Sequence, residues 1–327
     1  MMDYRLRTMK ITKLLPTLLL TLFLAACGDD NEDIIVKPGG NSGGSSSSSS
    51  VNNNKNTTGP TEARYRLEFP QMKGGNSVVV VHKAILNKNN KQEDVNYCVE
   101  WDPDVQSQRW SCYQMYSSIN YHSSYNVSRY YADNDGTLNP ECQYPNDPDL
   151  PPQYRFATDP FKYSGYDHGH ICPSADRLRS NEANYQTFFI TNMQPQRNKF
   201  NAGLWEKMEN HVRTWASNCD TLYVCKGGTI DMSENILGYI GSGSNRIPVP
   251  KYFFMAVLSR SGNSYKAAGF WVEHLNEDRS NDNLGNYVVN IYELQKLTNI
   301  DFFCNLPDDL ESTVESQPIV KKDWGLN

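Results

Sequence analysis

The sequence lacks three features that would narrow its function at once. It has no excess of positive charge, because 31 Lys and Arg residues stand against 37 Asp and Glu, and the net charge is −6. This balance excludes binding of polyanions through overall charge, although a local basic patch remains open. No Cys-x-x-Cys pair occurs, which argues against a cysteine-ligated zinc site. No internal repeat is present, so a solenoid is excluded.

A long apolar run is also missing, apart from one near the N-terminus. Lys10 and Lys13 precede an apolar stretch over residues 14–26, which is too short to span a bilayer comfortably but suits an export signal. It ends in Leu24-Ala25-Ala26-Cys27, which resembles the bacterial lipobox. We expect a signal peptide at 1–26, lipidation of Cys27, and an exported outer-membrane lipoprotein that contacts the membrane through this anchor. An ordinary secretory signal with a chance cysteine is the alternative.

Residues 27–63 have the composition of a flexible tether. The acidic tract at 28–33 resembles surface-export signals of some Gram-negative lipoproteins, so display on the cell surface and a solvated tail are both open. Residues 37–60 are rich in Gly, Ser, Asn and Thr, with six serines at 45–50, and cannot bury a core. Residues 64–327 are therefore expected to form one folded domain.

The chain has eight cysteines, of which seven follow Cys27. In an oxidising compartment these predict up to three disulfide bonds and one buried thiol, with the pairing left open. The seven are Cys98, Cys112, Cys142, Cys172, Cys219, Cys225 and Cys304.

Six segments carry a clear secondary-structure signal. Apolar, β-branched and aromatic runs predict strands at 77–81, 221–225, 252–258 and 265–272. Amphipathic patterns predict helices near 203–217 and 291–298. The mixture predicts an α+β domain.

Three motifs in the middle of the chain carry the most specific signal. The first is Asp167-His168-Gly169-His170-x-x-Pro173-x-x-Asp176. The second is Thr191-Asn192-x-x-Pro195-Gln196. The third is Asn201-x-Gly203-x-Trp205-x-x-Met208-Glu209.

In this order the motifs resemble those of the DNA/RNA non-specific endonucleases of the ββα-metal (His-Me finger) superfamily, which includes endonuclease G. The family motifs are Asp-Arg-Gly-His-x-x-Pro-x-x-Asp, Ser/Thr-Asn-x-x-Pro-Gln and Asn-x-Gly-x-Trp-x-x-Leu-Glu. The departure that matters is His168, where the family usually has arginine. Weaker resemblance extends over most of residues 100–312.

The resemblance implies a central antiparallel β-sheet flanked by helices, with a ββα element that presents His170 on its hairpin and Asn201 from the following helix. It also implies an enzyme that hydrolyses DNA and RNA phosphodiester bonds with little base preference and leaves 5′ phosphates. Mg²⁺ is the implied metal, Mn²⁺ is an alternative, and no small-molecule cofactor is expected.

His170 and Asn201 are the expected centre of the chemistry. A neutral imidazole, with an ordinary pKa of about 6.5, can take a proton from water at neutral pH; a structural histidine held in a turn is the alternative for His170. The resemblance makes Asn201 the metal ligand, and an amide oxygen suits a Mg²⁺ that keeps most of its waters. Because Asn201 falls at the start of a predicted helix, capping is the alternative use of the same oxygen.

The resemblance assigns further catalytic roles to Glu209, Arg213 and Arg129. Glu209 follows Asn201 by about 12 Å of helical rise, so it would reach a metal-bound water rather than the metal. An i,i+4 ion pair with Arg213 is a compatible alternative. Arg129 corresponds by position to an arginine that contacts the scissile phosphate, and a solvated surface arginine is the alternative.

Asp167, His168 and Asn192 are the expected substrate contacts. Arginine would grip phosphate through two hydrogen bonds, whereas His168 offers one donor per nitrogen, which predicts lower or more acid-favoured activity. If residues 167–170 are extended, His168 and His170 share a face and could instead bind Zn²⁺ together. A local basic patch is expected from residues that are close in sequence: Arg177, Arg179, Arg197, Lys199, Lys207 and Arg213.

The sequence thus predicts a metal-dependent endonuclease that acts on DNA and RNA. A catalytically feeble surface lipoprotein that binds nucleic acid or a protein partner is the alternative, suggested by His168. A structural lipoprotein of the envelope is a third option, and it predicts that His170→Ala loses no function.

Overall fold

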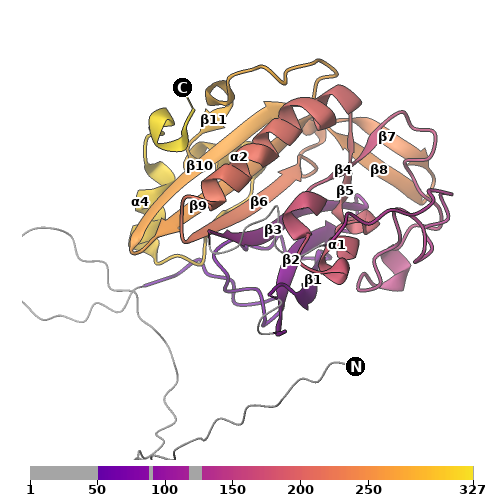
Figure 1. The fold of residues 1–327 in the computed structure, drawn as a ribbon, viewed down its shortest axis with the longest axis horizontal. Coiled ribbons are helices and arrows are strands. Elements are labelled where there is room, and N and C mark those ends of the chain that lie inside the picture. Colours follow the sequence, from indigo (N-terminus) through magenta and orange to yellow (C-terminus); the bar gives the residue numbers. More distant parts are fainter. Residues whose placement is uncertain (1–50, 88–90, 118–126, 327) are drawn as a thin grey trace, which may run out of the picture. The chain divides into compact units, whose positions relative to one another are not determined.

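The structure is a computed structural model, and it describes residues 51–87, 91–117 and 127–326 (Figure 1). The predicted signal peptide, Cys27 and residues 27–50 of the predicted tether lie outside the described residues. In the part of the chain that is described, no helix combines the length and the apolar character needed to cross a membrane.

A seven-stranded antiparallel sheet forms the centre of the fold, in the order β1-β2-β3-β6-β9-β10-β11. Its strands are β1 (Val78–Ile85), β2 (Glu93–Asp102), β3 (Ser107–Tyr116), β6 (Thr221–Gly228), β9 (Tyr252–Ser261), β10 (Ser264–Glu273) and β11 (Val288–Val289). Two hairpins lie outside it: β4 (Asp167–His170) with β5 (Met193–Gln196), and β7 (Ile236–Ser242) with β8 (Asn245–Pro250). The predicted α+β class with a central antiparallel sheet is confirmed.

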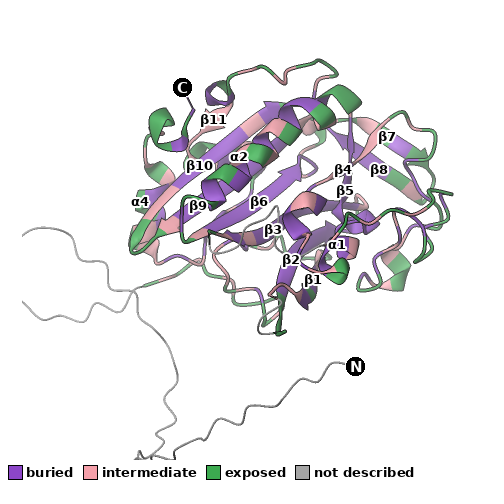
Figure 2. Cartoon of the chain, viewed as in Figure 1, coloured by how far each residue is buried: buried purple, intermediate pink, exposed green. Residues whose placement is uncertain are grey.

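Helices cover both faces of this sheet. They are α1 (Asn181–Gln186), α2 (Glu206–Ala216), α3 (Ile291–Thr298) and α4 (Asp308–Ser316). Alternate residues of β6 enter different cores, since Val224 packs in the cluster that contains α2 and Tyr223 in the cluster that contains α3 and α4. Figure 2 shows α2 with buried residues toward the sheet and exposed residues on its outer side. The sheet is therefore a rigid layer between two apolar cores.

Most predicted elements are present with longer bounds. The helix predicted at 291–298 is confirmed as α3, and the strand predicted at 252–258 is the first part of β9. Strands β2 and β3 were not predicted. Both are buried on their two faces and carry polar residues, among them Glu100 and Arg109, whose side chains form an ion pair at 3.0 Å. Because paired polar residues are buried here beside apolar ones, these strands lack the alternation of apolar and polar residues that identifies a half-buried strand in the sequence.

The last part of the predicted tether is bound to the domain. Asn52 Nδ2 donates to the carbonyl of Leu306 (2.7 Å), and Asn53 Nδ2 donates to Asp308 Oδ2 (2.7 Å). The backbone N–H of Asp308 donates to the carbonyl of Val51. Residues 51–53 are thus bound to the folded domain, partly through asparagine side chains whose hydrogen bonds composition does not reveal.

The disulfide bonds predicted from the cysteine count are absent from the described residues. All seven cysteines there are buried free thiols. Cys98 lies opposite Cys112 in the β2–β3 register, and Cys112 lies opposite Cys225 in the β3–β6 register. They pack in the apolar core as small hydrophobic side chains.

Candidate active site

Hairpin β4–β5 and helix α2 form a ββα element at one side of the sheet. His170 pairs with Met193 in the hairpin, and a π-helical turn, Phe200–Trp205, connects the hairpin to α2. Gly169 is required by close packing, because a Cβ atom there would lie 2.3 Å from Cδ of Gln196. The ββα arrangement that the motifs implied is therefore present, with the π-helical turn as an addition that sequence periodicity did not show.

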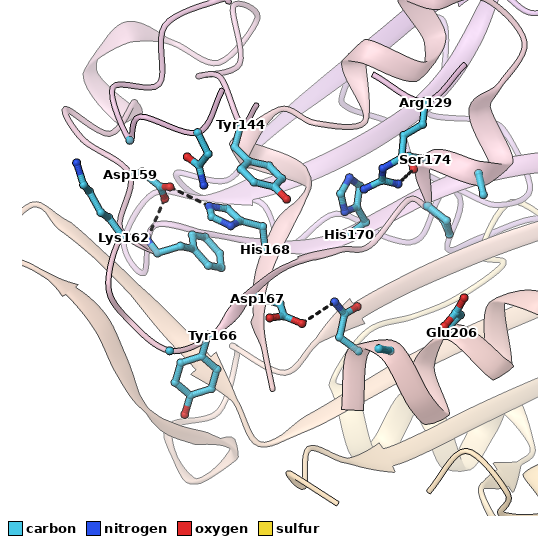
Figure 3. A pocket seen from close by; sticks show the side chains of 18 of the residues that line it. Arg129, Tyr144, Asp159, Lys162, Tyr166, Asp167, His168, His170, Ser174 and Glu206 are labelled. Carbon is cyan, nitrogen blue, oxygen red and sulfur yellow. Dashed lines mark hydrogen bonds and ion pairs between the residues drawn. The ribbon is translucent and has the colours of Figure 1, made fainter. Parts of the chain in front are cut away.

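A cleft of about 1050 Å³ opens over this element, and Figure 3 shows the side chains that point into it. Seven of the eight predicted site residues in the described part line it: Arg129, Asp167, His168, His170, Asn201, Glu209 and Arg213. Only Asn192 does not line it. The structure therefore brings these seven residues together in one cleft, while their individual roles depend on local contacts.

The imidazole of His170 is neutral and has one unused nitrogen. Burial, followed by the neighbouring Arg129 and His168, lowers the pKa of His170 to about 3. Nε2 is buried and lacks a hydrogen-bond partner among the described residues, whereas a ring nitrogen bonds the backbone of His168. That nitrogen must be Nδ1, so Nε2 is left as a proton acceptor. An unpaired buried nitrogen costs stability, which is expected of a functional atom rather than a structural one.

Asn201 is oriented by Asp167. Asn201 Nδ2 donates to Asp167 Oδ2 at 3.0 Å, and Asn198 Nδ2 donates to the same oxygen at 3.1 Å. Within the described chain no hydrogen bond engages Asn201 Oδ1, so this hard, neutral oxygen remains for a cation. The capping alternative is wrong, because neither the π-helical turn nor α2 has a side-chain cap. Asp167 thus contacts Asn201, and a carboxylate would repel a phosphate.

Glu209 lines the cleft and is held by two cations. Lys226 Nζ lies 2.9 Å from Glu209 Oε1, and the predicted i,i+4 partner Arg213 places Nη2 3.8 Å from Oε2. Burial raises the pKa of Glu209, and the two cations oppose that shift. Arg213 Nε also donates to Asp176 Oδ1 at 2.6 Å, which explains the last aspartate of the first motif. The sequence analysis assigned no role to Lys226, because a fully buried lysine lies in a strand of apolar neighbours.

Arg129 reaches into the cleft next to His170, as Figure 3 shows. It donates a hydrogen bond to Ser174 Oγ, and its guanidinium lies 4.8 Å from the centre of the Phe188 ring. The side chain is therefore held close to the imidazole rather than free in solvent. A phosphate beside Nε2 of His170 would meet its positive charge.

His168 is fixed in an aromatic sandwich. Its ring stacks on Tyr144 at 3.7 Å and on Phe161 at 4.1 Å between centroids, and Nε2 lies 2.9 Å from Asp159 Oδ2 (Figure 3). This nitrogen is thus not free to grip phosphate or to share Zn²⁺ with His170, so the zinc alternative is not supported. Asp159 and the two rings come from a loop without a recognisable motif, and the sequence analysis missed them.

The substrate-binding role predicted for Asn192 is wrong. Asn192 is fully buried, and its amide is used internally: Oδ1 accepts from the backbone N–H of Cys172 and from Ser111, while Nδ2 donates to the carbonyls of Cys172 and Thr187. It fixes the segment after β4 against the segment before β5. The second motif is therefore structural at this position.

The predicted local basic patch is also wrong as a surface feature. Arg177, Arg179 and Arg213 are buried. Arg177 lies over the ring of Tyr113 at 4.5 Å, and Lys207 Nζ donates to the carbonyl of Asp282 at 2.6 Å. Closeness in sequence did not place these cations on one exposed face.

Two groups of acidic and histidine side chains elsewhere have their ligand atoms within 4.8 Å of one another, among the residues that are described. One is Asp301, Glu311 and Glu315; the other is His82, Asp147 and Asp149. In the second group the carboxylates face opposite ring nitrogens of His82, at 3.1 Å and 3.6 Å. This arrangement suits a positively charged imidazole better than one shared ion, and neither group lines the cleft.

Comparison with known proteins agrees with this geometry. A family model described as DNA/RNA non-specific endonuclease matches residues 80–309. A nuclease from Nostoc sp. is 30% identical over 159 residues, which are 47% of this chain and 56% of that protein. The mitochondrial nuclease EXOG of Xenopus laevis is 24% identical over 231 residues, which are 68% of this chain and 61% of that protein.

A chain in the crystal structure of the EndoG/EndoGI complex has a similar fold, with a TM-score of 0.55 and 19% identity over 64% of this chain and 84% of that chain. This chain spans less than two thirds of the curated relatives above, 56% and 61% of their lengths. The family model nevertheless matches well over half of the sequence. The protein belongs to the DNA/RNA non-specific endonuclease family.

Proposed function

We propose that this protein is a metal-dependent endonuclease that hydrolyses phosphodiester bonds of DNA and RNA with little base preference. The observation that carries the proposal is the unpaired Nε2 of His170 in a cleft shared with Arg129 and Asn201. A proton acceptor, a cation and a neutral oxygen ligand are the groups that phosphodiester hydrolysis needs.

His170 and Arg129 provide the protein's part of the water attack. Nδ1 of His170 is fixed by the backbone of His168, so Nε2 accepts a proton from the water whose oxygen attacks phosphorus. The P–O3′ bond breaks, the 3′ oxygen takes up a proton from solvent, and the phosphate stays on the 5′ side. The negative charge of a bound phosphodiester raises the pKa of His170 from about 3, which makes the base stronger when substrate is present.

Asn201 Oδ1 is the proposed ligand of the divalent cation, with Mg²⁺ as the proposed metal and Mn²⁺ as the alternative. Such a cation supplies positive charge for the phosphate and for the departing oxygen. Asp167 holds the Asn201 amide in place through Nδ2. Glu209, fixed by Lys226 and Arg213, is positioned to orient water near the cation.

We also propose that the enzyme is exported and anchored to the outer membrane through lipidated Cys27. The support is the sequence Leu24-Ala25-Ala26-Cys27 after a short apolar run. Labelling with a radioactive fatty acid, compared between wild type and Cys27→Ala, tests this part separately.

The purified protein should degrade plasmid DNA and RNA in Mg²⁺ or Mn²⁺ and not in EDTA. His170→Ala should be at least about a hundred-fold slower. Asn201→Ala should need a higher Mg²⁺ concentration for half-maximal rate. Asn198→Ala is the matched control, because Asn198 donates to the same Asp167 oxygen but lies exposed and does not line the cleft. Intact substrates with either metal between about pH 5 and pH 9 would overturn the proposal in favour of a binding module.

A further inference from the structure

A turn on the wall of the cleft holds an aromatic ring in solvent. Tyr163 is 96% exposed, and it lines the cleft. Its backbone is in the left-handed region, with φ of 62°, and Gly165 follows with φ of 79°. The Ser164 N–H donates to the carbonyl of Phe161 at 2.9 Å and closes the turn. A bulky residue rarely adopts this conformation, and the exposed ring gains nothing from burial. Tyr163 in this turn therefore does not stabilise the fold.

A cation accompanies this ring. Lys162 Nζ lies 5.6 Å from the centre of the Tyr163 ring, and it donates to the carbonyl of Asp135 at 2.9 Å. Lys162 lines the cleft as well. The ring and the ammonium are therefore presented together at the cleft wall.

A similar pair lies by Arg129. Its guanidinium is 5.9 Å from the ring of Tyr131, which is 77% exposed. In the view of Figure 3, Lys162 and Arg129 lie on opposite sides of His168 and His170. An exposed tyrosine thus lies next to a cation at two places: Tyr163 with Lys162 in the cleft lining, and Tyr131, which is outside that lining, with the cleft residue Arg129. In this view the proposed proton acceptor lies between the two cations.

An exposed ring beside a cation matches the chemistry of a single nucleic-acid strand. An unpaired base can stack on an aromatic face while its phosphate meets the neighbouring cation, and the stacking tolerates every base. Bases in a duplex have both faces covered by neighbouring base pairs, so a tyrosine gains contact only if the duplex opens. We propose that Tyr163 with Lys162, and Tyr131 with Arg129, are stacking subsites for unpaired bases on either side of the scissile phosphate, so that single strands are the preferred substrate. This inference rests on the proposed function.

The test measures binding separately from cleavage. His170→Ala in Mg²⁺ is titrated into a fluorescent single-stranded DNA and into the matching duplex, and anisotropy gives both affinities. Adding Tyr163→Ala should weaken single-strand binding by at least about five-fold and change duplex binding by less than about two-fold. Tyr163→Phe should keep the affinity of the parent, because the ring remains.

Tyr292→Ala is the matched control. Tyr292 is 51% exposed on α3, and Lys296 Nζ lies 3.9 Å from its ring, but neither residue lines the cleft. This variant should bind both DNAs as the parent does. Equal loss for single strand and duplex in Tyr163→Ala, or no loss at all, would overturn the inference even if wild-type cleavage is normal. Loss confined to the single strand would support it even if wild type cleaves slowly.

Discussion

Two histidines in this molecule, the buried His82 in β1 and the partly buried His170 in β4, have opposite electrostatic surroundings. Burial alone would lower the pKa of His82, but Asp147 and Asp149 outweigh it and raise this pKa to about 9. At His170 burial acts in the same direction, and Arg129 and His168 add to it, so the pKa falls to about 3. One histidine is a positive charge within the fold, and the other is a neutral base.

The difference teaches that burial by itself does not assign a role to a histidine. The signs of the nearest charges do, because the interior screens them weakly. His82 has both nitrogens turned to carboxylates, which makes it an ionic link between β1 and the loop that contains Asp147. Nε2 of His170 has neither a hydrogen-bond partner nor a carboxylate beside it among the described residues, whereas both nitrogens of His82 have ion-pair partners.

The largest expected effect is on the cleavage rate, and it comes from replacing His170. His170→Ala should lower the cleavage rate by about 10² to 10⁴-fold, because proton transfer to a positioned base contributes that much. The melting temperature should stay within a few degrees of wild type. Rates on plasmid DNA and a thermal melt measure both, and a rate close to that of wild type would show that water is activated elsewhere.

The second prediction breaks the ionic link at His82. Asp147→Asn should destabilise the fold by about 3 to 5 kcal/mol at neutral pH, because it leaves a buried imidazolium without its nearest counter-charge. Denaturant unfolding measures this change. Asp149→Asn is the matched control with a smaller effect, because Asp149 lies farther away at 3.6 Å and its side chain is 61% exposed.

The pH dependence of stability checks the same link. The pKa of His82 is higher in the folded chain, about 9, than its ordinary value of 6.5. The link therefore stabilises the fold fully below about pH 6.5, and this contribution is lost as pH rises through about 9. Asp147→Asn should lack that loss, and parallel curves for the two proteins would contradict the assignment.

The smallest expected effect is a shift in the pH dependence of kcat/KM, and it tests what lowers the pKa of His170. Arg129→Gln removes one cause of its low pKa but leaves burial, the larger cause, in place. The acid limb of kcat/KM should move upward by less than about one pH unit, since the lost charge favoured the neutral ring. The pH–rate profile measures the shift, and kcat/KM should also fall because the phosphate loses a cation. A downward shift would show that another group sets the acid limb.

The motifs named residues that the structure brings together in one cleft, but they did not predict the surroundings of each residue. His170, Asn201 and Glu209 were located by spacing, because the chemistry restricts which residue types can stand there. Asn192 was misassigned, since no pattern distinguishes an amide that binds substrate from one whose four hydrogen bonds are internal.

Contacts between distant segments account for the rest of what was missed. Lys226 meets Glu209 only when β6 packs against α2, and Asp159 meets His168 only when the loop before β4 folds back. Strand β3 was missed for a related reason, since Arg109 is satisfied by Glu100 and by Asp231, 2.6 Å away, which comes from a remote part of the chain. The pattern of apolar and polar residues within one segment cannot show partners that come from a distant segment.

The π-helical turn at Phe200–Trp205 changes the rotation of the residues before α2 relative to those within α2. A continuous α-helix rotates by about 100° per residue, and a π-helical turn accommodates about one extra residue. Asn201 is thereby set at a rotation that counting back from Glu209 does not give, while Met208 and Val212 keep their positions in the core. The turn therefore sets the rotation of the proposed metal ligand relative to α2, and Leu204 and Trp205 anchor the turn in the same core as α2. Deleting one residue within the turn would change the rotation of Asn201 relative to α2, and it would also displace buried side chains of the turn from that core.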